Sequence, residues 1–178
     1  TELVTALNPI SEEKNFSARS SAIAEMESLT RVLSTRLANL SSDIGTARGA
    51  ETNTDVRNQL MAIEEQLQVA RASAEAMLAQ ITTLYGIQES YIAAGSAEDG
   101  YRARAQAIES DANARNRINT NASVLTGAVT TAASFVQEII TSPPTDTVLI
   151  SISRDIPILA ARASSTAGSL EAILTKIE

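Results

Sequence analysis

The sequence contains no cysteine, no histidine and no tryptophan among its 178 residues. Cysteine and histidine provide thiol nucleophiles, imidazole bases and most zinc and haem ligands, so these kinds of chemistry are excluded. Disulfide bonds are excluded too, while a chain without cysteine suits any redox compartment. Inward-facing Glu and His residues at the spacing of a di-metal bundle are also missing. We therefore expect a non-enzymatic protein without a metal or cofactor.

Proline, glycine and aromatic residues are scarce, at four prolines, seven glycines and 3% aromatics. Alanine, serine and leucine dominate instead, which is typical of helices that pack closely through small and aliphatic side chains. No run of 18 or more strongly apolar residues occurs, so we expect no membrane-spanning helix. The net charge of -7 disfavours free nucleic acid as a partner, because binding phosphates needs concentrated positive charge.

The clearest positive feature is a heptad pattern from Phe16 to Ala47. Two sets of mostly apolar positions repeat every seven residues: Phe16, Ile23, Thr30, Leu37 and Ile44, and then Arg19, Met26, Leu33, Leu40 and Ala47. Alternating steps of three and four place a narrow apolar stripe along one side of a long helix. Such a helix is not stable alone in water and must pack against other helices.

Similar stripes continue to the end of the chain and predict four helices, at about 12–48, 55–94, 97–141 and 146–177. The stripe of the second helix is Val56, Leu60, Ile63, Leu67, Ala70, Ala74, Met77, Ile81, Leu84, Gln88 and Tyr91. The stripe of the fourth helix is Leu149, Ile152, Ile156, Leu159, Ala163, Thr166, Leu170, Ile173 and Ile177. Ser11 suits an N-cap, while Gly49 and Gly95 suit helix ends. Short connections between long helices favour antiparallel hairpins. We predict an all-α fold: an elongated, antiparallel, up-down-up-down four-helix bundle built from two long coiled-coil-like hairpins. Residues 1–178 then form a single domain, with an N-terminal arm at 1–10.

Two places interrupt the pattern. The third stripe is interpreted as Tyr101, Ala105, Ile108, Ala112, Arg115 and Ile118, followed by Ala122, Leu125, Val129, Ala132, Val136 and Ile139. Two consecutive steps of three, from 112 to 118, predict local overwinding or a kink. In the last segment, Pro157 predicts a kink, and the β-branched stretch 147–153 reads as either helix or extended chain. We favour the helix, because a lone strand would have no partner.

Aromatic residues gather toward the predicted end that holds the second connection. They are Phe16, Tyr85, Tyr91 and Tyr101, with Arg102 and Arg104 beside them. Tyrosine and arginine at a bundle tip suit a binding patch for another molecule. The same residues also suit a plug for the end of the core, and the sequence leaves both interpretations open.

Halfway along the bundle, the predicted layers bring small and polar residues together: Thr30, Ala74, Asn119 and Thr166. This arrangement suits a polar ligand site, or a polar layer that fixes the register of the helices, and we favour the register layer. Arg115 lies nearby on the third stripe, and Glu75 is its predicted partner. An anion site at Arg115 is the alternative interpretation.

The stretch 118–137 carries no charged residue. A helix buried on several faces has this composition, and so has the insertion hairpin of a helical pore-forming protein. Its many Thr, Ser and Asn residues favour burial.

Together these features predict a structural or protein-protein interaction module: a rigid bundle that presents a surface to a partner protein or to a second copy of itself. The alternative is the extracytoplasmic ligand-sensing bundle of a receptor, with a small molecule between the helices. A pore-forming protein ranks third. The acidic, Ser/Thr/Ala-rich composition and a first residue, Thr1, that is not methionine favour a bacterial exported protein. We therefore expect an extracytoplasmic location: periplasmic, cell-surface or secreted.

Overall fold

A computed structural model describes residues 13–94, 98–139 and 147–177 of the chain. These residues form four helices: α2 (Glu13–Ala50), α3 (Thr54–Ala93), α4 (Glu98–Ile139) and α5 (Thr147–Lys176). No strand occurs within the described ranges. The predicted all-α class and the order of the helices are confirmed. The predicted arm at 1–10, the predicted N-cap at Ser11 and the predicted helix end at Gly95 lie outside the described residues.

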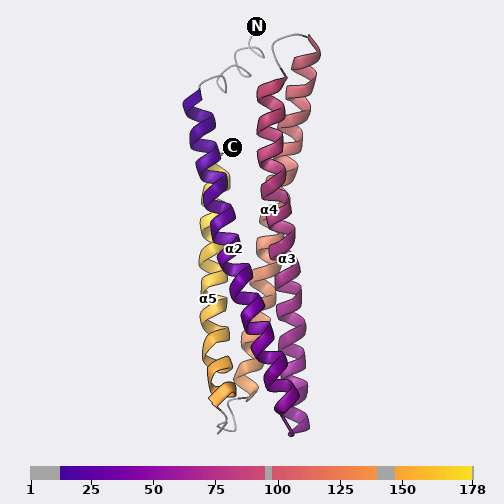
Figure 1. The fold of residues 1–178 in the computed structure, drawn as a ribbon, viewed down its shortest axis with the longest axis vertical. Helices are drawn as coiled ribbons and strands as arrows, with labels where there is room; N and C mark the ends of the chain where they lie inside the picture. The colour runs from indigo at the N-terminus through magenta and orange to yellow at the C-terminus, as the bar shows by residue number, and fades with distance from the viewer. Residues whose placement is uncertain (1–12, 95–97, 140–146, 178) are drawn as a thin grey trace.

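The helices form an antiparallel bundle in which each packs against two others. The contacts join α2 to α3, α3 to α4, α4 to α5, and α5 back to α2, with the most extensive contact between α3 and α4. In Figure 1 the chain runs down α2, up α3, down α4 and up α5. This is the up-down-up-down topology that the four stripes predict.

Asn53 fixes the start of α3. Its side-chain oxygen accepts hydrogen bonds from the backbone amides of Asp55 (2.9 Å) and Val56 (3.3 Å), two of the donors that the first helical turn leaves without partners. The first helix was predicted to end near Gly49, and α2 ends one residue later, at Ala50.

The buried residues follow the predicted stripes in α2, α3 and α5. All four helices contribute to one continuous apolar core. In α2 every stripe residue from Ile23 to Ala47 is buried, and Phe16 and Arg19 are half-buried. In α5 the stripe is buried from Leu149 to Ile177, except for half-buried Thr166. These three stripes were predicted correctly.

The stripe of α4 differs in its first half. The buried residues there are Gly100, Ala107, Asp111, Ala114 and Ile118, whereas Ile108 is 43% exposed. Tyr101, Ile108, Ala112 and Arg115 therefore lie one position away from the buried face, while Ile118 is buried as predicted. The buried face takes two consecutive steps of four, through 114, 118 and 122, so the two steps of three are wrong. The overwinding or kink inferred from those steps stays a prediction.

α5 is helical from Thr147, which confirms the helix prediction and contradicts the extended alternative for 147–153. The helix passes through Pro157, whose missing amide leaves the carbonyl of Ser153 without its usual helical donor. The predicted kink at Pro157 stays a prediction.

The uncharged stretch of α4 has one buried face and one exposed face. Ile118, Leu125 and Val136 are buried, while Asn119 and Thr130 on the opposite side are exposed. Burial on several faces is therefore not the reason for the missing charges. Among the described helices, none combines the length and the apolarity needed to cross a bilayer.

Candidate binding site at the open end

α5 is shorter than the helix that it packs against. It has 30 residues, whereas α4 has 42. Its last residues lie level with Asp111, because Arg19 bonds both Asp111 and the backbone carbonyl of Ile177. Residues 98–110 of α4 thus extend roughly 20 Å beyond α5. Figure 1 shows α3 and α4 rising above the end of α5. We call this part of the bundle, where the structure describes three helices, the open end.

A cavity of about 470 Å³ lies at the open end, a size typical of ligand sites. All four helices line it, with the last residues of α5 on one side. Its apolar wall consists of Phe16, Ala18, Ala22, Ile87, Tyr91, Ala107, Ile108 and Ile177. Its polar residues are Arg19, Gln88, Asp111, Arg115 and Lys176. We call it the end cavity.

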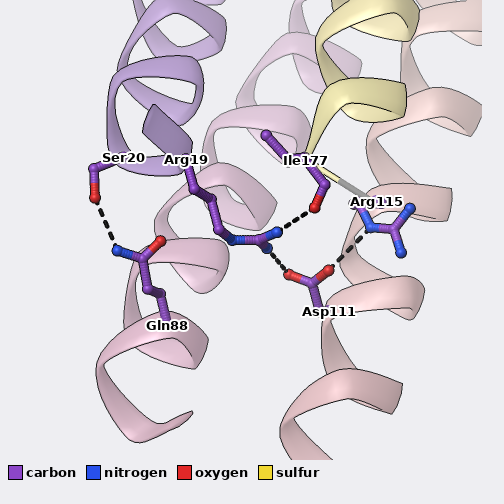
Figure 2. Close-up of polar contacts among 6 residues, drawn as sticks. All are labelled: Arg19, Ser20, Gln88, Asp111, Arg115 and Ile177. Carbon is purple, nitrogen blue, oxygen red and sulfur yellow. Dashed lines mark hydrogen bonds and ion pairs between the residues drawn. The ribbon is translucent and has the colours of Figure 1, made fainter. Parts of the chain in front are cut away.

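An ion-pair cluster forms one side of the end cavity (Figure 2). Asp111 is only 9% exposed and accepts hydrogen bonds from two guanidinium groups, Arg19 on α2 and Arg115 on α4. The Nε of Arg115 lies 3.0 Å from Oδ2 of Asp111. Arg19 also donates to the carbonyl of Ile177, where the last turn of α5 leaves acceptors free and carries a partial negative charge. Arg19 therefore ties three helices together at the point where α5 ends.

Gln88 contributes a second polar contact from α3. Its Nε2 donates to Oγ of Ser20 on α2 across 2.8 Å. Its Oε1 is buried without a hydrogen-bond partner among the described residues. In Figure 2 this oxygen points to the side where Arg19 lies. A buried acceptor without a donor costs roughly 1–3 kcal/mol.

Phe16, Tyr91 and Arg104 form the aromatic part of the open end. The ring centroids of Phe16 and Tyr91 lie 6.3 Å apart at a tilt of 50°, and Tyr91 is 8% exposed. The guanidinium carbon of Arg104 lies 5.2 Å from the centroid of the Tyr91 ring, a cation–π contact. Arg104 also has a buried Nε without a partner among the described residues. Three of the six residues in the predicted patch thus come together.

The other three predicted patch residues lie apart from this cluster. Tyr101 and Arg102 are exposed on the first turns of α4, and neither lines the end cavity. Tyr85 is half-buried and packs against the core. Burial, and secondarily the charge of Glu27, raise the pKa of the Tyr85 hydroxyl.

The predicted polar layer halfway along the bundle is not assembled. Thr30 is fully buried, but its hydroxyl donates to the carbonyl of Met26 (2.8 Å) within the same helix. Asn119 is exposed, and Thr166 is half-buried. Arg115 lies at the end cavity and pairs with Asp111, so the predicted partner Glu75 is wrong. Glu75 pairs instead with Arg71 on the surface of α3.

Sequence reasoning missed Asp111, Gln88 and Arg19 as site residues. Arg19 and Gln88 occupy stripe positions where apolar residues were expected, which was a usable signal. The sequence signal for Asp111 was weaker, because the stripe of α4 was assigned from apolar residues and passed through Ala112 instead. A carboxylate on the buried face becomes plausible once two arginines are placed within reach of it.

A second cavity of about 440 Å³ lies between α2 and α5 near the opposite end. Its charged residues are Arg36, Asp43, Arg154, Asp155 and Arg162. Hydrogen bonding from Arg154 lowers the pKa of Asp155, and both side chains are largely exposed. Within the described part of the chain, no three acidic residues gather as potential metal ligands. The end cavity is therefore the better candidate, because its charges are more deeply buried.

No protein-family model matches the sequence, and neither the curated proteins nor the solved structures include a match to it.

Proposed function

We propose that this chain is a non-enzymatic interaction module: a rigid helical rod that binds another molecule at its open end. The observation that carries the proposal is the end cavity of about 470 Å³, which residues from all four helices line. The cavity combines an apolar wall with half-buried charges, a combination that suits recognition. Along the rest of the bundle, the core is filled by aliphatic side chains.

The rim of the open end supports a protein as the partner. Ile92 at the end of α3 is 53% exposed, and Tyr101 at the start of α4 is 37% exposed. Arg102 is exposed beside Tyr101. Aromatic residues and arginine are enriched in protein interfaces and supply much of their binding energy.

The test is site-specific photo-crosslinking in cells that naturally produce the protein. A photoreactive phenylalanine analogue replaces Tyr101 in one version and Val124 in the other. Val124 is the matched control, because it is 45% exposed and lies on the same helix away from the open end. We expect a discrete crosslinked protein at position 101 only. That protein, once purified, should bind Tyr101→Ala at least tenfold more weakly than the natural chain. Equal crosslinking at both positions would refute the proposal.

A ligand-sensing bundle of a receptor is the second candidate function. It is favoured by the position of the end cavity between helices, and by its volume within the range of small-molecule sites. In Figure 1, the start of α2 and the end of α5 lie in the same half of the bundle as the end cavity. A ligand in the cavity would therefore contact the two helix ends directly, which suits transmission of a signal. The extracytoplasmic location expected from the composition is compatible with both candidate functions and stays a prediction.

A further inference from the structure

We propose that the second cavity marks the centre of a face through which two copies of this chain pair, with their bundles antiparallel. We call it the groove face. It consists of the residues of that cavity that are at least partly exposed: Arg36, Asn39 and Asp43 on α2, and Arg154, Asp155, Ile158 and Arg162 on α5. This face lies away from the open end, so the inference goes beyond the proposed function and does not depend on it.

The charges of the groove face repeat with the same spacing on both helices. Arg36 and Asp43 are seven residues apart on α2, and Asp155 and Arg162 are seven residues apart on α5. The two helices are antiparallel, and the hydrogen bond from α2 to the last turn of α5 sets their register. Counting along both helices from that bond places the two arginines at one level and the two aspartates at another, about 10 Å away. The face therefore has a positive end and a negative end.

Most of these charges are available to a second molecule. Within the described part of the chain, no side-chain hydrogen bond or ion pair engages Arg36, Asp43 or Arg162. Arg154 is the exception, because its Nε lies 2.9 Å from Oδ1 of Asp155. It lies level with the two aspartates, so it reduces the negative charge at that end without cancelling it.

A second copy of the chain complements this arrangement. When the two bundles lie antiparallel, α2 meets α2, α5 meets α5, and the positive end of each face meets the negative end of the other. Arg36 then lies opposite Asp43 of the second copy, and Asp155 lies opposite Arg162 of the second copy. A parallel pair would instead place Arg36 opposite Arg162, which is unfavourable. The charges thus select one symmetric arrangement, in which a two-fold axis makes the face complementary to itself.

Ile158 lies at the centre of the groove face, midway between its charged ends. Its side chain is 45% exposed, although residues of this kind favour burial. In the antiparallel pair it lies close to the two-fold axis and meets Ile158 of the second copy. Both side chains then leave water, which favours association.

The size of the overlap predicts a weak pair. The centre of the face lies about ten residues before the end of α2, so two copies overlap over roughly 30 Å. Two neighbouring helices are roughly 20 Å wide, which gives roughly 600 Å² of contact on each copy. This is at the low end for a specific interface, so we expect a reversible dimer with a Kd in the micromolar range. Its two open ends point away from each other.

Charge reversal tests the pairing by sedimentation equilibrium from about 1 μM to 1 mM. Arg36→Asp and Asp43→Arg should each weaken the dimer at least tenfold, because each variant places like charges opposite each other twice. An equal mixture of the two variants should form a dimer again, because each then meets the opposite charge. Arg71→Asp, which makes the same change on the surface of α3, is the matched control and should leave the Kd unchanged. Circular dichroism confirms that each variant folds.

Two further variants test the arrangement. Arg154→Gln should tighten the dimer several-fold, because it removes a cation that faces the arginines of the second copy. The natural chain has no cysteine, so Ile158→Cys introduces a single thiol close to the two-fold axis. Mild oxidation should link two such chains by a disulfide much faster than two chains carrying Val124→Cys, which changes a similarly exposed position on α4.

Three results would overturn the inference. The first is a natural chain that stays monomeric at every concentration. The second is a dimer that neither charge reversal weakens, since its interface would then lie elsewhere. The third is a dimer in which position 158 forms a disulfide no faster than position 124, since its arrangement would then not be the antiparallel one. None of these results affects the crosslink expected at Tyr101, so the proposed function and the dimer fail separately.

Discussion

The two halves of α4 occupy different surroundings, and the difference explains the candidate site. From Ile118 onward the helix lies in a four-helix core and buries aliphatic residues such as Leu125 and Val136. Before Ile118 it buries Gly100, Ala107, Asp111 and Ala114, which are small or charged. Ala107, Asp111 and Arg115 of the first half line the end cavity. Small residues there leave space unfilled, and the charged residues pair with one another across helices.

The comparison teaches that the residues on the buried face of α4 decide where the core is filled. From Ile118 onward this face carries large aliphatic side chains, whereas Ala107, Asp111 and Ala114 are small or polar and leave room for the end cavity. A cavity with a polar side follows from the same heptad pattern that fills the core elsewhere.

The largest expected difference between the two halves of α4 is in the unfolding free energy lost when an isoleucine is replaced, at Ile118 or at Ile108. Ile118 is fully buried, while Ile108 is 43% exposed. Ile118→Ala should lower the free energy of unfolding by about 3 kcal/mol, because it leaves a cavity in a packed core. Ile108→Ala should lower it by less than about 1 kcal/mol. Urea unfolding followed by circular dichroism measures both; equal losses would mean that α4 has no open half.

The second prediction tests the ion-pair cluster of the open end. Asp111→Asn leaves Arg19 and Arg115 without their shared carboxylate in a partly buried setting. We expect a loss of about 2 kcal/mol of unfolding free energy, less than for a fully buried pair because both arginines keep some contact with water. Glu75→Gln, which breaks the exposed pair with Arg71, is the matched control and should cost under about 0.5 kcal/mol. A loss at Asp111 no larger than that of the control would contradict a structural role for the cluster.

Much of the fold could be predicted from the sequence, because one regular signal recurs in every helix. The stripes of α2, α3 and α5 contain enough aliphatic residues for their spacing to identify the buried face. The first half of α4 was assigned one position off, since Ile108 and Ala112 looked like core while Asp111 did not. Burial of Asp111 depends on Arg19, 92 residues earlier in the chain. A periodicity within one helix carries no information about such a contact.

The candidate site was only partly predictable for a related reason. Phe16, Tyr91 and Arg104 were identified because aromatic and arginine residues were unusual at the tip of a helix pair. The cavity itself depends on how the four helices are placed along one another, which the spacing of stripes within one helix does not give.

The third prediction compares how the two ends are held. At the end of the bundle opposite the open end, Asn53 caps α3 by accepting hydrogen bonds from two backbone amides. At the open end, the Arg19 side chain donates a hydrogen bond to the backbone carbonyl of Ile177. Asn53→Ala should lower the unfolding free energy by about 1 kcal/mol, the usual cost of losing an N-cap. Asn53→Gly, which retains the favoured backbone conformation, should cost only a few tenths of a kcal/mol. Equal costs for the two variants would show that the side-chain bonds do not contribute.

The smallest effect concerns Tyr85, which is half-buried and packs against the core. Burial, and secondarily the charge of Glu27, raise the pKa of its hydroxyl above the ordinary tyrosine value of about 10. Since the folded state holds this proton more tightly than the unfolded state, the stabilisation is fully present below the unfolded pKa. It is lost as the pH rises through the folded pKa. Tyr85→Phe should therefore make the unfolding free energy less sensitive to pH in this alkaline range.

Tyrosinate absorbance of the natural chain and of Tyr85→Phe gives the pKa of Tyr85 by difference. Glu27→Gln should lower that pKa only slightly, because desolvation is the larger cause. A return of the pKa to the ordinary value in Glu27→Gln would mean that Tyr85 is solvated and that its neighbour's charge alone shifts it. Water would then reach beyond the end cavity toward Glu27, and the part of the core that excludes water would end closer to the middle of the bundle.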